Sequence, residues 1–395
     1  MATTTMTITN EAEAAGMATP VTAEQIKVEA PGQSLEGGEM EVVDMPDLCA
    51  SFMSAPVRLN PAFEEVKREA DQWISDVMVG TDPKWPAINK KANLALLSAL
   101  WDADCNPYAL RTINDFASCI FAFDDQFDEG PLATDLDAAL DEIAKTRAIL
   151  DDQGPRYSPE YYPIRYVFQT LWDRVKGSPD GYLIGKQSSD NFRQRWKWAH
   201  DVYFDAVAEQ VRIKVEGRDA KLVEDEFLAV RRGTVGTSMI LALLEWCAGI
   251  DLPRDIVEHP SIREAFRVVS DLLLVVNDIL SYKKDVQYGV DHNLIISWKS
   301  RGFTTQESMD KAGDMLNNCF RRWYTALAEL PCYGEDTDRD VCRCLDIYRN
   351  VAVASLHWSF ETGRYLGKEG AEVRATRKLR LPKYMSSAGG VKITA

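Results

Sequence analysis

The sequence lacks the features that define several large classes of protein. None of its 395 residues belongs to an uninterrupted apolar run of about 18 residues. The two best candidates, residues 234–250 and 268–280, are interrupted by Glu245 and Asp271, which argues against stable insertion in a membrane. Acidic residues outnumber basic ones by 61 to 45, and the net charge of −16 disfavours non-specific binding to nucleic acid or to an anionic lipid surface.

Signals for targeting, disulfide bonding and nucleotide binding are also missing. The N-terminus has neither a basic region followed by an apolar run nor an Arg-rich amphipathic pattern, so we expect a cytoplasmic location. The eight cysteines include no Cys-x-x-Cys pair, which predicts reduced thiols. The four histidines have no metal-ligand spacing. Neither a Gly-rich nucleotide loop nor a nucleophile elbow occurs, which excludes P-loop ATPases and α/β-hydrolases.

The chain divides into an acidic N-terminal tail, a helical body and a short C-terminal tail. Residues 1–45 contain no aromatic residue and carry one Lys against eight acidic residues. Such a segment buries too little apolar surface to offset the entropy of ordering. We therefore expect a disordered segment over residues 1–45, one domain over residues 46–382 and a flexible tail over residues 383–395.

Helical periodicity runs through the body and predicts an all-α protein. The expected helices cover residues 61–80, 88–101, 107–126, 136–151, 159–175, 189–215, 221–249, 260–286, 304–330 and 336–366. Residues 268–280 are mostly apolar, so neighbours must surround their helix on nearly all sides. Any polar residue in that helix must be paired or must face a cavity. The pattern predicts a bundle with a central layer.

One acidic cluster ends the helix predicted over residues 107–126. Asp124 and Asp128 are four residues apart, and Asp125 and Asp128 are three apart, so the carboxylates project close together. Their repulsion and the helix dipole disfavour this grouping unless a divalent cation is bound. Oxygen ligands suit Mg²⁺. The alternative is a solvated acidic helix end; an EF-hand fits less well, because Glu129 stands where that loop requires Gly.

A second cluster ends the buried helix. Asn277, Ser281 and Asp285 are spaced by four residues, which places them on one helix face. Their amide, hydroxyl and carboxylate oxygens can hold Mg²⁺ and leave positions for water and phosphate. The alternative is a polar turn where the helix reaches the surface. Two such helix ends that face each other would clamp a diphosphate through metal ions.

A diphosphate also requires cationic contacts. Arginine binds phosphate through forked hydrogen bonds, and a phenol can add another. Candidates are Arg231 or Arg232, Lys284, Arg364 and Tyr365, with the last two at the end of the last long helix; taken singly, each fits an ordinary surface position as well. Gly233 and Gly236 follow the two arginines and weaken the helix enough to admit a break.

Taken in this order, the motifs resemble those of a class I terpene synthase, specifically a fungal sesquiterpene cyclase of the basidiomycete type, over roughly residues 46–382. Residues 124–128 are similar to the family's aspartate-rich motif. Residues 277–285 are similar to its second metal motif, although Asp285 stands where Glu is commoner. Arg231, with Arg232 as the competing choice, matches the family's diphosphate-sensing arginine, and Arg364-Tyr365 resembles its C-terminal Arg-Tyr pair.

The resemblance implies an all-α bundle around a central apolar active-site cavity. It also implies a lyase that ionises farnesyl diphosphate, cyclises the carbocation to a sesquiterpene hydrocarbon or alcohol and releases diphosphate. Three Mg²⁺ ions would be held by Asp124, Asp125, Asp128, Asn277, Ser281 and Asp285. Arg231, Lys284, Arg364 and Tyr365 would contact the diphosphate. Phe121 and Trp358 are candidates for the cavity wall, with ordinary core packing as the alternative.

Two other functions stay open on the sequence. One is chain-elongating prenyltransfer, although elongating enzymes carry a second aspartate-rich motif where this chain has residues 277–285. The other is a non-enzymatic helical scaffold, which needs no cavity between the acidic helix ends. The expected partner is a prenyl diphosphate, and we expect a monomer or a homodimer.

Overall fold

The computed structural model describes residues 40–80, 82–177, 188–218 and 222–382. The predicted tails over residues 1–39 and 383–395 lie outside these ranges. The α-helices are α1 (Phe63–Met78), α2 (Trp85–Ala92), α3 (Leu94–Trp101), α4 (Pro107–Asp128), α5 (Leu136–Leu150), α6 (Pro163–Lys176), α7 (Asp190–Val215), α8 (Glu224–Thr234), α9 (Thr237–Cys247), α10 (Arg254–Val257), α11 (Pro260–Tyr288), α12 (Leu294–Ser300), α13 (Thr305–Ala328), α14 (Glu335–Glu361) and α15 (Gly370–Thr376). Short 3₁₀ turns cover Ser51–Ser54, Pro131–Thr134 and Gly367–Glu369.

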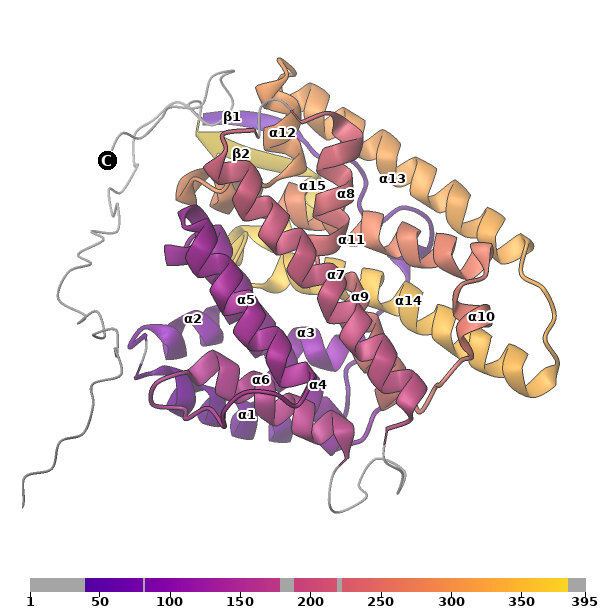
Figure 1. Cartoon of the computed structure of the whole chain (residues 1–395). Helices are drawn as coiled ribbons and strands as arrows, with labels where there is room; N and C mark the ends of the chain where they lie inside the picture. Colours follow the sequence, from indigo (N-terminus) through magenta and orange to yellow (C-terminus); the bar gives the residue numbers. More distant parts are fainter. Residues whose placement is uncertain (1–39, 81, 178–187, 219–221, 383–395) are drawn as a thin grey trace, which may run out of the picture. The chain divides into compact units, whose positions relative to one another are not determined.

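Two short strands accompany the helices. Strand β1 (Met40–Asp44) pairs antiparallel with β2 (Lys378–Pro382), so the two ends of the described chain lie side by side (Figure 1). Residues 40–44 were assigned to the disordered tail, and for these five residues the assignment is wrong. Val43 and Leu381 are buried there, whereas Val42 is exposed. An alternation over so few residues is too short to stand out in the sequence.

The central helices were predicted nearly as they occur, and the break that the glycines after Arg231 and Arg232 admit is present. The helix expected over residues 221–249 is divided into α8 and α9, because Gly236 adopts a left-handed conformation with φ of 73°. Similarly, Asn93, with φ of 52°, separates α2 from α3. Helix α12 was not predicted. Helix α14 ends at Glu361, so Arg364 and Tyr365 lie beyond the last long helix rather than at its end.

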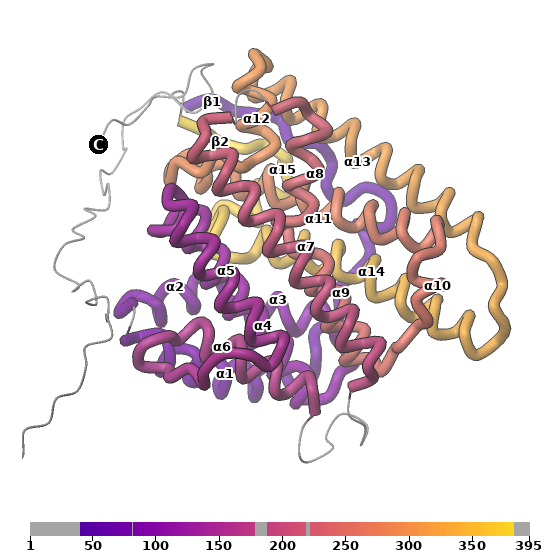
Figure 2. Tube along the Cα trace, in the orientation of Figure 1, coloured from indigo at the N-terminus to yellow at the C-terminus, as the bar shows by residue number. Residues whose placement is uncertain are grey.

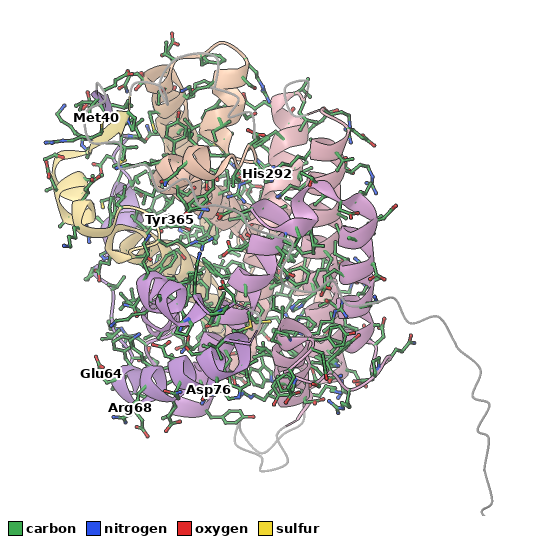
Figure 3. The ribbon with its side chains drawn as sticks, turned by 90° about the vertical axis from the view of Figure 1, so that its left-hand side faces the viewer. Met40, Glu64, Arg68, Asp76, His292 and Tyr365 are labelled. Atoms are coloured by element: carbon green, nitrogen blue, oxygen red, sulfur yellow. The ribbon has the colours of Figure 1, made fainter. Side chains whose placement is uncertain are left out.

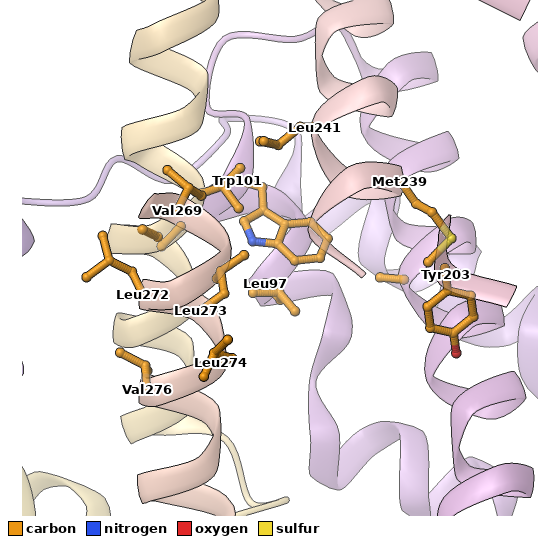
Figure 4. Packing of buried hydrophobic residues seen from close by; sticks show 14 of the residues in the cluster. Leu97, Trp101, Tyr203, Met239, Leu241, Val269, Leu272, Leu273, Leu274 and Val276 are labelled. Atoms are coloured by element: carbon orange, nitrogen blue, oxygen red, sulfur yellow. The ribbon is translucent and has the colours of Figure 1, made fainter. Parts of the chain in front are cut away.

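Helices α3, α9, α11 and α14 form the inner part of the bundle, and α11 packs against both α13 and α14. Figure 2 shows how α7 crosses in front of α9, and the two helices are in contact. The close-up in Figure 4 shows Leu97 and Trp101 of α3 between apolar side chains of α9 and α11. This core surrounds α11 with neighbours, as its apolar sequence predicts.

The acidic residues inside the apolar helices are paired, as their burial requires. Asp271 of α11 contacts Arg232 and also Arg322, the latter at 2.7 Å. Glu245 of α9 lies 3.1 Å from Arg195. The stretch Glu224–Cys247, which spans α8 and α9, is long and apolar enough to be a candidate membrane span by length and composition. In this structure 67% of its most apolar window is buried inside the protein.

Close packing of α8 against α7 generates the first prediction. A Cβ atom at Gly233 would lie 2.3 Å from Cβ of Ala206, so the substitution Gly233→Ala must push the two helices apart. We expect it to lower the free energy of unfolding by about 1–3 kcal/mol, measured by denaturant titration. The matched variant Gly80→Ala meets no atom within 4 Å and should change stability by less than about 0.5 kcal/mol. Equal stability of the two variants would contradict the packing argument.

Candidate active site

The two acidic clusters meet across one pocket of about 110 Å³. Asp124 and Asp128 reach it from the C-terminal end of α4, and Asn277, Ser281 and Asp285 reach it from the last turns of α11. The sequence placed these clusters about 150 residues apart and predicted that they face each other, and the structure brings them together. Arg231, Lys284, Arg364 and Tyr365 line the same pocket. In Figure 3, Tyr365 and His292 mark this region, far from Glu64, Arg68 and Asp76 of α1.

The aspartates of α4 are held by α7. The hydroxyl of Tyr203 donates to Oδ1 of Asp124 at 2.7 Å, and Nε2 of Gln210 donates to Oδ1 of Asp128 at 2.6 Å. Loss of hydration raises the pKa of Asp124, the charge of Asp128 raises it further, and the Tyr203 hydrogen bond opposes the rise. Burial also raises the pKa of Asp128, against the effect of Gln210. A bound cation would stabilise both carboxylates in their charged form.

The metal-ligand candidates of α11 form hydrogen bonds with one another and with neighbouring residues. Ser281 donates its hydroxyl proton to Asp285, whose Oδ2 also accepts a hydrogen bond from Asn293 at 2.9 Å. The amide of Asn277 accepts from Nη2 of Arg231 at 2.8 Å and donates to the Tyr365 hydroxyl at 2.8 Å. Their spacing of four residues therefore does place all three side chains on the face that lines the pocket.

The structure separates the two adjacent arginines. Arg231 is buried, lines the pocket and binds Asp278 through Nε at 3.0 Å and Nη2 at 2.6 Å. Although desolvation opposes the charge, Asp278 raises the pKa of Arg231 above its ordinary value. Arg232 points away from the pocket and pairs with Asp271. One residue corresponds to about 100° of helix rotation, so only one of the two can face the pocket.

The other cations are paired with Asp125 of the first cluster and with the neighbouring Glu129. Arg364 binds both oxygens of Asp125, at 2.5 and 3.2 Å, and its guanidinium lies 5.3 Å from the centre of the Phe121 ring. Lys284 binds Glu129 and lies 3.2 Å from Oδ1 of Asp285. Asp125 is thus directed toward Arg364 and is not among the described residues that line the pocket, unlike Asp124.

The aromatic wall differs in part from the prediction. Phe121 lines the pocket, but Trp358 packs behind it with ring centres 5.7 Å apart and donates Nε1–H to the Ala92 carbonyl at 2.9 Å. Sequence reasoning missed Trp101, which lines the pocket from α3. It also missed Tyr203 and Gln210. The only available signal was their spacing of seven residues, two turns, on one face of the helix expected over residues 189–215.

The donor set fits Mg²⁺ in its chemistry. All the donors are hard oxygens, and the buried carboxylates of Asp124 and Asp128 have raised pKa values that a cation would reverse. Among the described residues no three acidic, His or Cys side chains form a compact metal cluster. The donors are instead divided between α4 and α11, which leaves room for phosphate oxygens to complete the coordination.

The pocket is small for the reaction that the sequence implies. Its 110 Å³ is below the ~300–1,000 Å³ of typical small-molecule sites, so a long hydrocarbon chain requires the surrounding side chains to move. A larger hollow of about 850 Å³ lies along α7, α9 and α11 and includes Arg232 and Glu245. It contains none of the predicted metal ligands.

Comparisons with known proteins agree with the fold. The family model described as "Terpene synthase family 2, C-terminal metal binding" matches residues 115–322, more than half of the chain. The structure of germacradien-4-ol synthase from Streptomyces citricolor is similar, with a TM-score of 0.66 and 20% identity, covering 80% of this chain and 99% of that one. That likeness shows the all-α terpenoid synthase fold. The chain belongs to the terpene synthase family.

Sequence relatives are considerably closer. A (1R,4R,5S)-(-)-guaia-6,10(14)-diene synthase from Fusarium mangiferae is 49% identical, covering 90% of this chain and 89% of the relative. A protein from Gibberella fujikuroi described as an inactive guaia-6,10(14)-diene synthase is 48% identical with the same coverage. The fungal assignment is thus confirmed. The basidiomycete type is not, because Fusarium is an ascomycete genus.

The orientation of the two arginines generates the second prediction. Arg231→Lys keeps the charge beside Asp278 but loses the forked contacts, so we expect kcat/KM for a prenyl diphosphate to fall at least about tenfold. Arg232→Lys lies outside the pocket and should keep kcat/KM within about twofold of the unmodified protein. Steady-state kinetics with matched thermal melts check both. An equal loss in the two variants would contradict the assignment of Arg231 to the pocket.

Proposed function

We propose that the protein is a Mg²⁺-dependent sesquiterpene synthase that ionises farnesyl diphosphate and cyclises the resulting carbocation, with release of diphosphate. The observation that carries this proposal is the convergence of two oxygen-donor clusters and the cations Arg231, Lys284 and Arg364 on one pocket. A helical scaffold needs no such pocket. A fifteen-carbon substrate, three metal ions, a cytoplasmic location and a monomer or homodimer belong to the proposal.

Metal-mediated binding of the diphosphate is assigned to the oxygen-bearing side chains that face the pocket. Asp124, Asp128, Asn277, Ser281 and Asp285 would hold the Mg²⁺ ions, with Asp125 assisting. When bound, these ions neutralise the charge that develops on the leaving diphosphate. Residues of the chain provide the remaining contacts.

Hydrogen bonding to the diphosphate requires an exchange of partners. Arg364 and Lys284 now bind Asp125 and Glu129, and each would donate N–H groups to phosphate oxygens instead. Tyr365, bonded to Asn277, would donate its hydroxyl proton in the same way. Donors that point at the leaving group stabilise it more as the C–O bond lengthens and negative charge builds up.

The hydrocarbon part of the reaction needs no protein nucleophile. Once ionised, the allylic cation must be kept from water, and aromatic ring faces can stabilise it by about 0.5–2 kcal/mol each. Phe121 and Trp101 are the pocket-lining rings assigned to this role, with Trp358 supporting Phe121 from behind. The skeleton of the product depends on the shape that the enlarged pocket adopts around the chain.

The third prediction tests the activity directly. Incubation with geranyl, farnesyl and geranylgeranyl diphosphates plus Mg²⁺ should give cyclic sesquiterpenes from farnesyl diphosphate, identified by gas chromatography and mass spectrometry. Because a 48% identical relative is described as inactive, similarity alone does not replace this assay. Longer diphosphates formed on addition of isopentenyl diphosphate would instead indicate chain elongation, and absence of any turnover would contradict the proposal.

The fourth prediction tests the metal ligands. Asp124→Asn and Asn277→Ala should each abolish detectable turnover, because the first removes a negative charge and the second an oxygen donor from a metal site, while the helical circular dichroism spectrum stays unchanged. The matched variants are Asp137→Asn, at an exposed position in α5, and Asn318→Ala, at an exposed position in α13; both should retain full activity. Near-normal turnover in Asp124→Asn or Asn277→Ala would refute the assignment of the metal ligands.

A further inference from the structure

The segment that follows α11 turns back onto the pocket and contacts α11 and α8. Backbone N–H of Val290 donates to the Asp285 carbonyl at 2.8 Å, and backbone N–H of Leu294 donates to Oδ2 of Asp278 at 2.7 Å. Between them, the buried Asn293 donates to Oδ2 of Asp285 at 2.9 Å. We call residues 290–294 the return loop. Sequence reasoning assigned none of its residues to the site.

His292 is the return-loop residue that reaches toward α8. Its Nε2 lies 3.1 Å from Oγ1 of Thr234, and its ring lies 5.3 Å from that of Phe227, also of α8. His292 and Thr234 both line the pocket. Oγ1 of Thr234 in turn accepts a hydrogen bond from Nη1 of Arg231 at 3.2 Å. A chain of two hydrogen bonds therefore runs from His292 to the arginine.

The direction of this chain depends on which nitrogen of the neutral His292 ring carries the proton. Burial lowers the pKa of His292, and the charges of Arg231 and Lys214 lower it further, so the imidazole is neutral. A neutral ring can accept at Nε2 when its proton is on Nδ1. In this tautomer Thr234 donates its single proton to His292 rather than to the Arg231 carbonyl, and its oxygen lone pairs are available to Arg231. The histidine thereby fixes the hydroxyl in the orientation that accepts from Nη1.

The hydrogen bonds of Arg231 leave one of its N–H groups without a partner among the described residues. A guanidinium has five N–H groups. Nε and one N–H of Nη2 bind Asp278, the second N–H of Nη2 binds Asn277, and one N–H of Nη1 binds Thr234. Among the described residues the remaining N–H of Nη1 has no recorded partner. Because the guanidinium is planar, fixing the other four sets the direction of the fifth, on a residue that lines the pocket.

We infer that His292 is a positioning residue for diphosphate ionisation, which acts through Thr234 to aim the free N–H of Arg231 at the leaving diphosphate. The inference rests on the proposed function. Among the described residues, the hydrogen bond and the ring contact of His292 go to Thr234 and Phe227 and not to the proposed metal ligands. Its loss leaves the charge of Arg231 and its contacts with Asp278 in place, but it frees the Thr234 hydroxyl to turn toward the Arg231 carbonyl, 3.3 Å away.

Three variants separate this role from packing. His292→Phe keeps a ring against Phe227 but removes the acceptor, and we expect kcat with farnesyl diphosphate to fall about tenfold while KM changes less than about twofold. His292→Gln can place its amide oxygen near the position of Nε2 and should restore kcat to within about threefold. Thr234→Val should reproduce the loss in His292→Phe. The matched control His259→Phe, at the start of α11 and away from the pocket, should leave kcat unchanged.

The double variant His292→Phe/Thr234→Val decides whether the two residues act in series. If His292 acts through Thr234, the double variant loses no more activity than Thr234→Val alone. Multiplied losses would overturn the inference, as would a His292→Gln variant no better than His292→Phe. Affinity for inorganic diphosphate plus Mg²⁺, measured by calorimetry, gives a readout without turnover and should weaken in His292→Phe but not in His292→Gln. If the unmodified protein binds diphosphate but does not react, the proposed function fails, and the same affinity comparison still tests the arrangement of Arg231.

Discussion

Arg231 and Asp278 form a buried ion pair between α8 and α11, and the arrangement of the pocket depends on it. The Asp278 side chain is fully buried, and that of Arg231 is 10% exposed. Burying two charges is costly unless their remaining hydrogen-bonding groups are also satisfied. Here the backbone N–H of Leu294 binds Asp278, while Asn277 and Thr234 bind Arg231. The pair therefore ties α8, α11 and the return loop together at the pocket.

The same constraint explains why the helix between residues 224 and 247 is broken. A continuous helix would carry the apolar side chains of α9 straight on from α8. The turn at Gly236 instead ends α8 at Thr234, so that the last turn of α8 presents Arg231 and Thr234 to the pocket. Gly233, one turn before Gly236, permits the close contact with Ala206 of α7. Two glycines in one short segment thus serve two different purposes, one conformational and one steric.

The parts of the site that the sequence revealed are those encoded locally. Asp124 and Asp128, and Asn277, Ser281 and Asp285, each share a helix face through spacings of four residues, and helical geometry alone groups them. The partners that hold these groups come from elsewhere in the chain. Tyr203 is 79 residues from Asp124, and no local pattern links them. The choice between Arg231 and Arg232 depends on the rotation of α8, which only its packing against α7 and α11 determines.

The acidic side chains around the pocket are hydrogen-bonded in this structure, in a chain whose net charge is −16. In the first cluster, a cation binds Asp125, and neutral donors bind Asp124 and Asp128. The neighbouring Glu129 is bound by Lys284. Binding of the diphosphate with its Mg²⁺ ions would break the ion pairs of Arg364 and Lys284. The metal ions would then compensate the released carboxylates, and the diphosphate would bind the released Arg364 and Lys284. The groups that change partners lie on α4, on α11 and beyond the end of α14. Their exchange would draw these three segments toward the same ligand. Such a movement would close the pocket and exclude water from a carbocation.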